Sequence, residues 1–335
     1  MSRAQLTSTV EQNTGGAVSP YVAGKNKIIN GDFGIWQRGT SFASPATASY
    51  TSDRWRLGFD GTGTCTVSQQ TFTPGTAPVA GYESTYFLRH LVTAAGTTTF
   101  TQVFQPIEDV RTFAGQTVTF SFWAKADTTR SSFIYAEQNF GSGGSATVQY
   151  LSMGSASLTT SWQRFSFTVA LSSIAGKTIG TSSSLNFYVR NGTTLNATLD
   201  IWGVQLEAGS VATPFTTATN TLSGELAACQ RYYWRAGGDS NFQPYGVGAG
   251  LNSTTAQFSV QNPVPMRIAP TSIDFSTLAV TDTRTAFSVS GIGFANAGKY
   301  ASTINVAATG MTSSLPYILV SNNSTSGFLG LSAEI

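Results

Sequence analysis

The sequence predicts an all-β protein, and composition gives the first reason. Of the 335 residues, 48 are Thr, 40 are Ser and 34 are Gly. Thr is stiff at χ1 and packs well on a pleated surface, while Gly supplies the backbone conformations that tight turns need. Charged residues make up only 10% of the chain, against roughly a quarter in a typical soluble protein. This composition favours strands and turns over helices.

Alternation of apolar and polar residues gives the second reason. In residues 117 to 125, Val118, Phe120, Phe122 and Ala124 fall on one face, because successive side chains of a strand point to opposite sides. The other face carries Thr119, Ser121, Trp123 and Lys125. Two further segments alternate in the same way, with apolar residues at Phe165, Phe167 and Val169 and at Leu185, Phe187 and Val189. Each segment is predicted to be a strand with one face toward the core.

Turn residues between these segments give the third reason. Gly141-Ser-Gly-Gly144 and Asn191-Gly192 separate alternating runs, which is the spacing expected of an antiparallel sandwich. A jelly-roll-like arrangement of two sheets is therefore the predicted architecture.

Length and local pattern divide the chain into three parts. At about 150 residues per domain, a chain of 335 residues is expected to hold two domains. Residues 1 to 24 have no periodic apolar pattern and are interpreted as an extended arm that docks on a partner. Residues 25 to 219 are predicted to form the sandwich, and residues 220 to 335 a short helix followed by a second β-rich domain.

The predicted helix lies at the junction of the two domains. In residues 222 to 234, Leu222, Leu226, Cys229 and Tyr233 recur at spacings of three and four. This spacing is typical of a short amphipathic helix.

Charge and residue counts exclude several functions. A net charge of +2 with no basic run does not provide the clustered positive field that nucleic-acid binding needs. The sequence has one histidine, His90. One histidine cannot form a multi-histidine metal site, and any Ser-His-Asp arrangement would have to use it, so most hydrolytic mechanisms lack the residues that they need. No stretch approaches 18 apolar residues, and the amino end has no signal-peptide pattern. We therefore expect neither nucleic-acid binding nor membrane insertion. We expect the chain to be made in the cytoplasm.

The two cysteines, Cys65 and Cys229, lie far apart in the sequence. They lack the dense spacing of a disulfide-stapled secreted domain. We interpret both as buried free thiols.

The last hundred residues are poor in charge. Residues 236 to 335 hold only seven charged residues, namely Arg267, Arg284, Lys299, Asp239, Asp274, Asp282 and Glu334. A surface this neutral resists association poorly. We expect it to be buried against identical neighbours.

Three spaced stretches of the sequence form a distinctive combination of motifs. The first is Asn26-Lys-Ile-Ile-Asn-Gly-Asp-Phe-Gly-Ile-Trp-Gln-Arg-Gly-Thr-Ser41 with Tyr50-Thr-Ser-Asp-Arg-Trp55. The second is Trp202-Gly-Val-Gln-Leu-Glu-Ala-Gly-Ser-Val-Ala-Thr-Pro-Phe215 running into Glu225-Leu-Ala-Ala-Cys-Gln-Arg-Tyr-Tyr233. The third is Pro263-Val-Pro-Met-Arg267 with Ala269-Pro-Thr271.

Together these stretches resemble the sandwich domains of tailed-bacteriophage fibre proteins. This resemblance implies a jelly-roll domain of the carbohydrate-binding-module kind within a homotrimeric fibre. The fibre would attach to tail or capsid proteins of the virion through residues 1 to 24 and bind a glycan on the host cell surface. It would be made in the host bacterial cytoplasm and act in the virion. The resemblance leaves open whether the protein is a tail fibre or a head fibre.

Four side chains are candidates for the glycan-binding site. Sugar C–H faces stack on aromatic rings, while amides, hydroxyls and guanidinium groups fix orientation. Trp123, Tyr188 and Arg190 lie on the non-core faces of their predicted strands, and Gln102 lies between Phe100 and Phe104, which we interpret as core-facing. We expect these four candidates to share one concave face. If so, replacing Trp123 by Ala would weaken binding with little effect on stability; the alternative is that this second face packs against a loop or a neighbouring subunit.

Metal binding and catalysis find less support. Asp32 and Asp200 match the positions at which jelly-roll modules hold a structural calcium, but no dense run of carboxylates accompanies them. Glycoside cleavage needs two carboxylates at a defined separation, and no pair in the sequence is recognisable as such. We therefore expect a protein without cofactor or enzymatic activity. The alternatives are a head-fibre or decoration protein without a specific receptor, and a glycan depolymerase.

Overall fold

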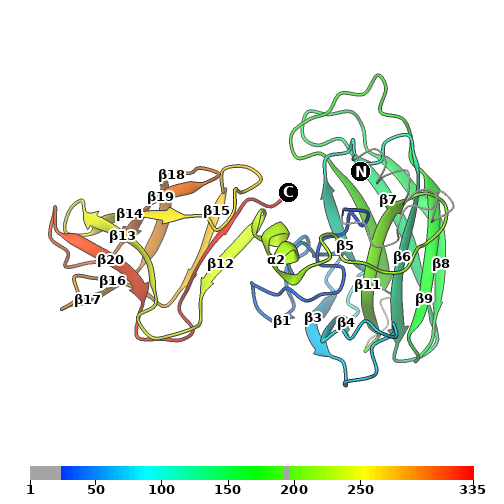
Figure 1. Cartoon of the computed structure of the whole chain (residues 1–335), viewed down its shortest axis with the longest axis horizontal. Coiled ribbons are helices and arrows are strands. Elements are labelled where there is room, and N and C mark those ends of the chain that lie inside the picture. The colour runs from blue at the N-terminus through cyan, green and yellow to red at the C-terminus, as the bar shows by residue number, and fades with distance from the viewer. Residues whose placement is uncertain (1–23, 192–195) are drawn as a thin grey trace, which may run out of the picture. The chain divides into compact units, whose positions relative to one another are not determined.

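The computed structural model describes residues 24 to 191 and 196 to 335 (Figure 1). The predicted arm, residues 1 to 24, lies outside this range except for its last residue. The chain divides into two compact units, the first ending at Glu225 and the second running from Leu226 to Ile335.

The first unit is a sandwich of two antiparallel sheets, as the alternation predicts. A six-stranded sheet has the order β1-β3-β4-β11-β6-β9, with β1 Ser41–Ala43, β3 Thr64–Thr71, β4 Tyr86–Ala94, β11 Thr198–Ala208, β6 Thr117–Ala126 and β9 Gln163–Ala170. A five-stranded sheet has the order β2-β5-β10-β7-β8, with β2 Arg56–Phe59, β5 Thr101–Glu108, β10 Ser184–Asn191, β7 Arg130–Asn139 and β8 Val148–Leu158. The many non-consecutive neighbours give the unit its jelly-roll-like topology.

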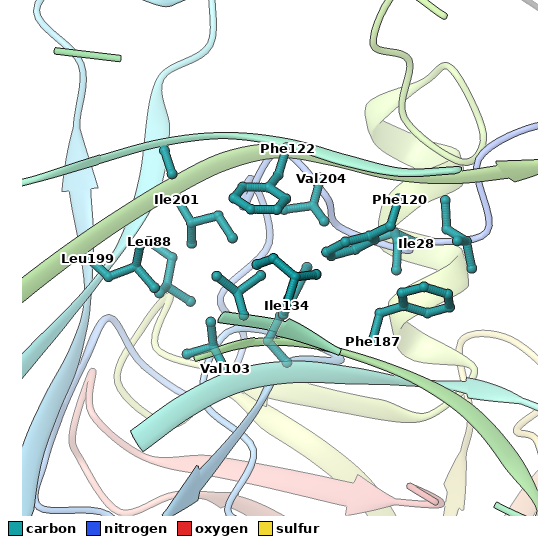
Figure 2. Packing of buried hydrophobic residues seen from close by; sticks show 14 of the residues in the cluster. Ile28, Leu88, Val103, Phe120, Phe122, Ile134, Phe187, Leu199, Ile201 and Val204 are labelled. Carbon is teal, nitrogen blue, oxygen red and sulfur yellow. The ribbon is translucent and has the colours of Figure 1, made fainter. Parts of the chain in front are cut away.

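The core lies between the two sheets (Figure 2). Phe120 and Phe122 of β6 are fully buried, and the Phe120 ring lies 5.0 Å from that of Phe187 on β10. Since burial of a large side chain contributes about 2 to 3 kcal/mol, these aromatic residues fix which face of each strand points inward.

Two buried asparagines hold the loop of the opening stretch: Asn26 joins it to the closing strand, and Asn30 bonds within the loop. Asn26 donates to the carbonyls of Val204 and Thr216, and its Oδ1 accepts the amide of Leu206. Asn30 donates through Nδ2 to the carbonyl of Ile35. Buried amides that satisfy backbone groups in this way replace ladder bonds that a loop lacks, so these motif residues have a structural role.

The helix α2 (Leu222–Gln230) is shorter than the sequence spacing suggested. Tyr233 lies in strand β12, and Leu222 is 73% exposed. The amide of Tyr232 bonds the carbonyl of Cys229, a tight closing turn, after which the aromatic residues Tyr233 and Trp234 favour a strand.

The second unit also consists of antiparallel strands. Its three-stranded sheet has the order β12-β21-β15, with β12 Tyr233–Gly237, β21 Phe328–Ser332 and β15 Ser272–Ser276. Its seven-stranded sheet has the order β17-β16-β20-β13-β14-β19-β18, with β17 Ala286–Ser288, β16 Leu278–Thr281, β20 Pro316–Ser321, β13 Pro244–Gly250, β14 Thr255–Gln261, β19 Ala301–Ala307 and β18 Gly291–Asn296. Both sheets contribute to one core.

Candidate functional site

The candidate site is the outer face of the five-stranded sheet, hereafter the aromatic face. Strand register brings its side chains together in two rows. One row runs Arg56, Phe104, Tyr188 and Tyr135 across β2, β5, β10 and β7. The next row runs Gly58, Gln102, Arg190 and Phe133 across the same strands. Directly opposed residues of neighbouring strands lie on the same side of a sheet, so the two rows form one surface.

Stacked rings form the floor of this face. The rings of Tyr135 and Tyr188 lie 4.2 Å apart and almost parallel, at 2°. Phe104 stacks on the other side of Tyr188 at 4.6 Å, and the Arg56 guanidinium lies 5.3 Å from the Phe104 ring. All three rings are buried, so they support the face from below.

Polar groups at the ring edges are held in fixed orientations. The Tyr135 hydroxyl donates to Gln102 Oε1 at 2.5 Å, and the Tyr188 hydroxyl donates to Glu137 Oε1 at 2.6 Å. Burial raises the pKa of both tyrosines, and the Glu137 carboxylate adds to the effect at Tyr188. Both hydroxyls therefore stay protonated at neutral pH and act as donors. Asn186 Nδ2 also donates to Glu137 Oε1, at 2.7 Å.

Phe133 is the exposed ring on the aromatic face. Its side chain is 59% exposed, and it pairs across the strands with Arg190 and with Ser155 of β8. The sequence interpretation missed this residue because Phe133 and Ile134 are adjacent and both apolar. The signal that identifies it is the outward series Phe133, Tyr135 and Glu137, which alternates with buried Ile134.

The structure brings together three of the four candidates. Gln102, Tyr188 and Arg190 all lie on the aromatic face. Phe100 and Phe104 were expected to face the core, but both lie on this same side: Phe104 stacks on Tyr188, and the Phe100 ring lies 4.3 Å from the Arg190 guanidinium. The core side of β5 is instead formed by Val103 and Ile107.

The expectation that Trp123 shares this face is wrong. Trp123 belongs to β6, which lies in the six-stranded sheet, and it points outward on the opposite side of the sandwich. Alternation gives a side chain's orientation relative to its own core face, but it does not say to which of two sheets the strand belongs.

Trp123 packs instead in an aromatic cluster on the outside of the six-stranded sheet. The members of this covered cluster are Phe72, Phe87, Trp202 and Phe215, with Tyr82, Trp123 and Trp162 packed against them. Residues 72 to 85 and 209 to 219 supply several of these side chains, so two loops cover this face. The arrangement matches the alternative in which the second face packs against a loop.

The two calcium candidates have other partners. Asp200 receives both Arg89 Nε and Arg89 Nη2 at 2.7 Å, and Lys125 Nζ lies 3.7 Å away. Asp32 accepts the Tyr82 hydroxyl at 3.1 Å, and burial raises the pKa of its carboxyl. Within residues 24 to 191 and 196 to 335, no group of three His, Cys, Asp or Glu side chains is placed to hold a metal ion.

A hollow near Asp32 is a second concave feature of the first unit. Its volume is about 400 Å³, and its lining includes Asp32, Tyr82, Glu83, Tyr86 and Leu222. It lies beside the covered cluster, since the Tyr82 ring packs on Trp202.

The histidine and the cysteines are structural. His90 is fully buried, and burial lowers its pKa to about 4; its Nδ1 lies 3.0 Å from Asn191 Nδ2. Cys65 and Cys229 are buried and form no disulfide, as the sequence predicted, and burial raises the pKa of the Cys65 thiol to about 11. All three side chains are buried away from solvent.

Of the helices formed by residues 24 to 191 and 196 to 335, none combines the length and the apolar character needed to span a bilayer.

Comparison with known proteins gives only distant likenesses. The sequence matches no protein-family model and no curated protein. Among solved structures, a CBM4 carbohydrate-binding module is 21% identical with a TM-score of 0.34, and the match covers 54% of this chain and 98% of that chain. The enzymatically active domain of bacteriophage CBA120 tailspike protein 4 is 18% identical with a TM-score of 0.36, covering 57% of this chain and 22% of that chain. The CBM22-1 xylan-binding domain of Paenibacillus barcinonensis Xyn10C is 13% identical with a TM-score of 0.33, covering 57% and 98%. Likenesses at these scores are too loose to establish a shared function.

Proposed function

We propose that this chain is a non-enzymatic structural protein of a tailed-phage fibre, and that its first unit binds a bacterial surface glycan on the aromatic face. The observation that carries the glycan part is the exposed Phe133 ring beside Arg190, above a floor of fixed donors and acceptors. An exposed ring offers a stacking surface for sugar C–H groups, and the nearby polar groups bind hydroxyls.

Sequence supports the fibre part of the proposal. The stretches between residues 26 and 271 resemble phage fibre domains, and residues 1 to 24 would dock on a tail or capsid protein. Residues 1 to 23 lie outside the described range, so this attachment stays a prediction.

The second unit is the proposed site of homotrimer formation. Its seven-stranded sheet contains no Asp, Glu, Lys, Arg or His in any strand. The outward Val247 is 69% exposed, and neither edge strand, β17 or β18, carries a charge that would oppose pairing. Three weak sugar sites on one rigid body would gain affinity through effective concentration.

Cell binding by paired variants tests the glycan site. Purified protein is incubated with intact host bacteria, and bound protein and phage adsorption are measured. Phe133→Ala should reduce binding about tenfold, because one well-placed ring contributes about 1 to 1.5 kcal/mol. The matched control is Phe242→Ala, which removes a ring that is 50% exposed in the second unit.

Other outcomes would assign the protein differently. Equal binding by Phe133→Ala and the unmodified chain would contradict the aromatic face as the site. Absence of binding at high concentration would favour a head-fibre or decoration protein, and release of reducing ends from host polysaccharide would favour a depolymerase.

Native mass spectrometry tests the trimer. We expect a particle of about 106 kDa, three copies of a 35.3 kDa chain. A stable single chain would contradict it.

A further inference from the structure

The arginines and carboxylates of the aromatic face are not paired with one another. Register places two guanidinium groups on this face, those of Arg56 and Arg190, and two carboxylates, those of Glu137 and Glu108. Glu108 lies opposite Ser184, six residues from Arg190 along β10. Among the described residues neither guanidinium forms an ion pair, whereas Arg89, Lys125 and Arg130 are each paired with an aspartate.

Of these two arginines, Arg190 says more about the charge of the ligand. Its guanidinium contacts only neutral side chains: it interacts with the Tyr135 hydroxyl and donates a long hydrogen bond from Nη2 to Gln102 Oε1, at 3.4 Å. Its Nε is buried without a partner in the described part of the chain. The groups that face it are uncharged: Gln102 of β5, Phe133 and Tyr135 of β7, and Phe100, the residue before β5.

Glu137 is placed too far along the sheet to neutralise Arg190. Register puts Glu137 opposite Asn186, four residues from Arg190 on the same strand. At about 3.3 Å per residue, this is a separation of about 13 Å between backbone positions. The Glu137 carboxylate is also occupied, because it accepts from Tyr188 and Asn186.

The Arg190 guanidinium is held in place without being neutralised. It lies 4.3 Å from the centre of the Phe100 ring and 4.9 Å from that of Tyr135. Contacts of this kind fix the plane of the guanidinium while leaving its charge uncompensated. A planar guanidinium fixed in advance matches a carboxylate, which it binds through two parallel hydrogen bonds.

From this charge complementarity we infer that the ligand of the aromatic face is an acidic glycan, with a sugar stacked on Phe133 and its carboxylate bound by Arg190. The inference rests on the proposed function, since it names the ligand class of the same site. A uronic acid is the simplest such sugar, because its ring presents a C–H face and its carboxylate projects from one edge. Arg56 adds a second positive charge, two strands away.

Binding to matched acidic and neutral oligosaccharides tests the inference. The probes are an oligogalacturonate and the same oligomer with its carboxyls methyl-esterified, titrated by isothermal calorimetry into the full chain. The acidic form should bind at least about tenfold more tightly, because a charged hydrogen-bonded pair is worth about tenfold to a hundredfold. Its affinity should also fall as salt is raised.

Two variants separate this inference from the proposed function. Arg190→Gln should lose about tenfold or more for the acidic oligomer and little for the ester, while Phe133→Ala should weaken both. The control Arg284→Gln removes an exposed arginine of the second unit and should change neither. Equal affinity for acid and ester, or an Arg190→Gln variant that binds the acid normally, would overturn the inference while leaving glycan binding intact. Binding of neither oligomer would count against both.

Discussion

The two outer faces of the sandwich are both rich in aromatic residues, but only one is open. On the six-stranded sheet, Trp123 and Trp202 pack under residues 72 to 85 and 209 to 219. On the five-stranded sheet, Phe133 remains 59% exposed above the stacked rings of Tyr135 and Tyr188. Alternation thus identifies a face that points away from the core. Whether that face can meet a ligand depends on which loop folds over it.

The largest loss of stability is expected from replacing the most buried residue of the covered cluster, Trp202. Trp202→Ala should lower the free energy of unfolding of the first unit by about 3 to 5 kcal/mol, because Trp202 is fully buried and its ring packs on those of Phe72, Tyr82 and Phe215. Chemical denaturation followed by circular dichroism measures it. A loss below about 1 kcal/mol would mean that the cluster is not tightly packed.

The predictability of these two faces differs for a physical reason. The strand predicted over residues 117 to 125 could be oriented from the sequence, because Val118, Phe120, Phe122 and Ala124 share one parity and Trp123 is the single large apolar residue on the other. The core face of strand β5 could not be predicted in this way, because Val103 and Phe104 are adjacent and both apolar. Only pairing with β10 decides that Val103 enters the core and Phe104 stacks on Tyr188. The sheet to which Trp123 belongs depends likewise on long-range pairing, which local sequence does not encode.

A pH titration examines the core that both faces share. His90 has a folded-state pKa of about 4, below its unfolded value of about 6.5. The unfolded chain therefore binds more protons between these values, so stability is complete above pH 6.5 and falls as pH drops toward 4, by about 3 kcal/mol in total. The measurement is the difference in unfolding free energy between the unmodified chain and His90→Asn at pH 7 and at pH 4.5. The same pH dependence in both proteins would show that His90 is not buried in neutral form.

Replacement of Trp123 tests whether the outer face of the six-stranded sheet is covered rather than open to ligand. Because Trp123 is only partly buried in the covered cluster, Trp123→Ala should cost about 1 to 3 kcal/mol of stability and leave binding to cells unchanged below the unfolding transition. This reverses the expectation drawn from alternation alone. Thermal unfolding and a cell-binding assay measure both quantities. Weakened binding by a fully stable variant would return Trp123 to the binding site.

The smallest effect on stability is expected on the open face. Phe133→Ala should change the unfolding free energy by less than about 0.5 kcal/mol, because an exposed side chain loses little packing. Denaturant unfolding of this variant beside Trp123→Ala gives the contrast. A cost equal to that of Trp123→Ala would imply that Phe133 is covered too.

Hydroxyl-radical footprinting of the unmodified protein tests the central claim most directly, that ligand binds on the aromatic face. The modification rates of Phe133 and Phe242 are compared with and without surface polysaccharide from the host bacterium. If ligand binds on this face, polysaccharide should slow the modification of Phe133 severalfold and leave that of Phe242 unchanged. Unaltered modification of Phe133, with protection confined to Tyr82 and Tyr86 beside the hollow, would contradict it.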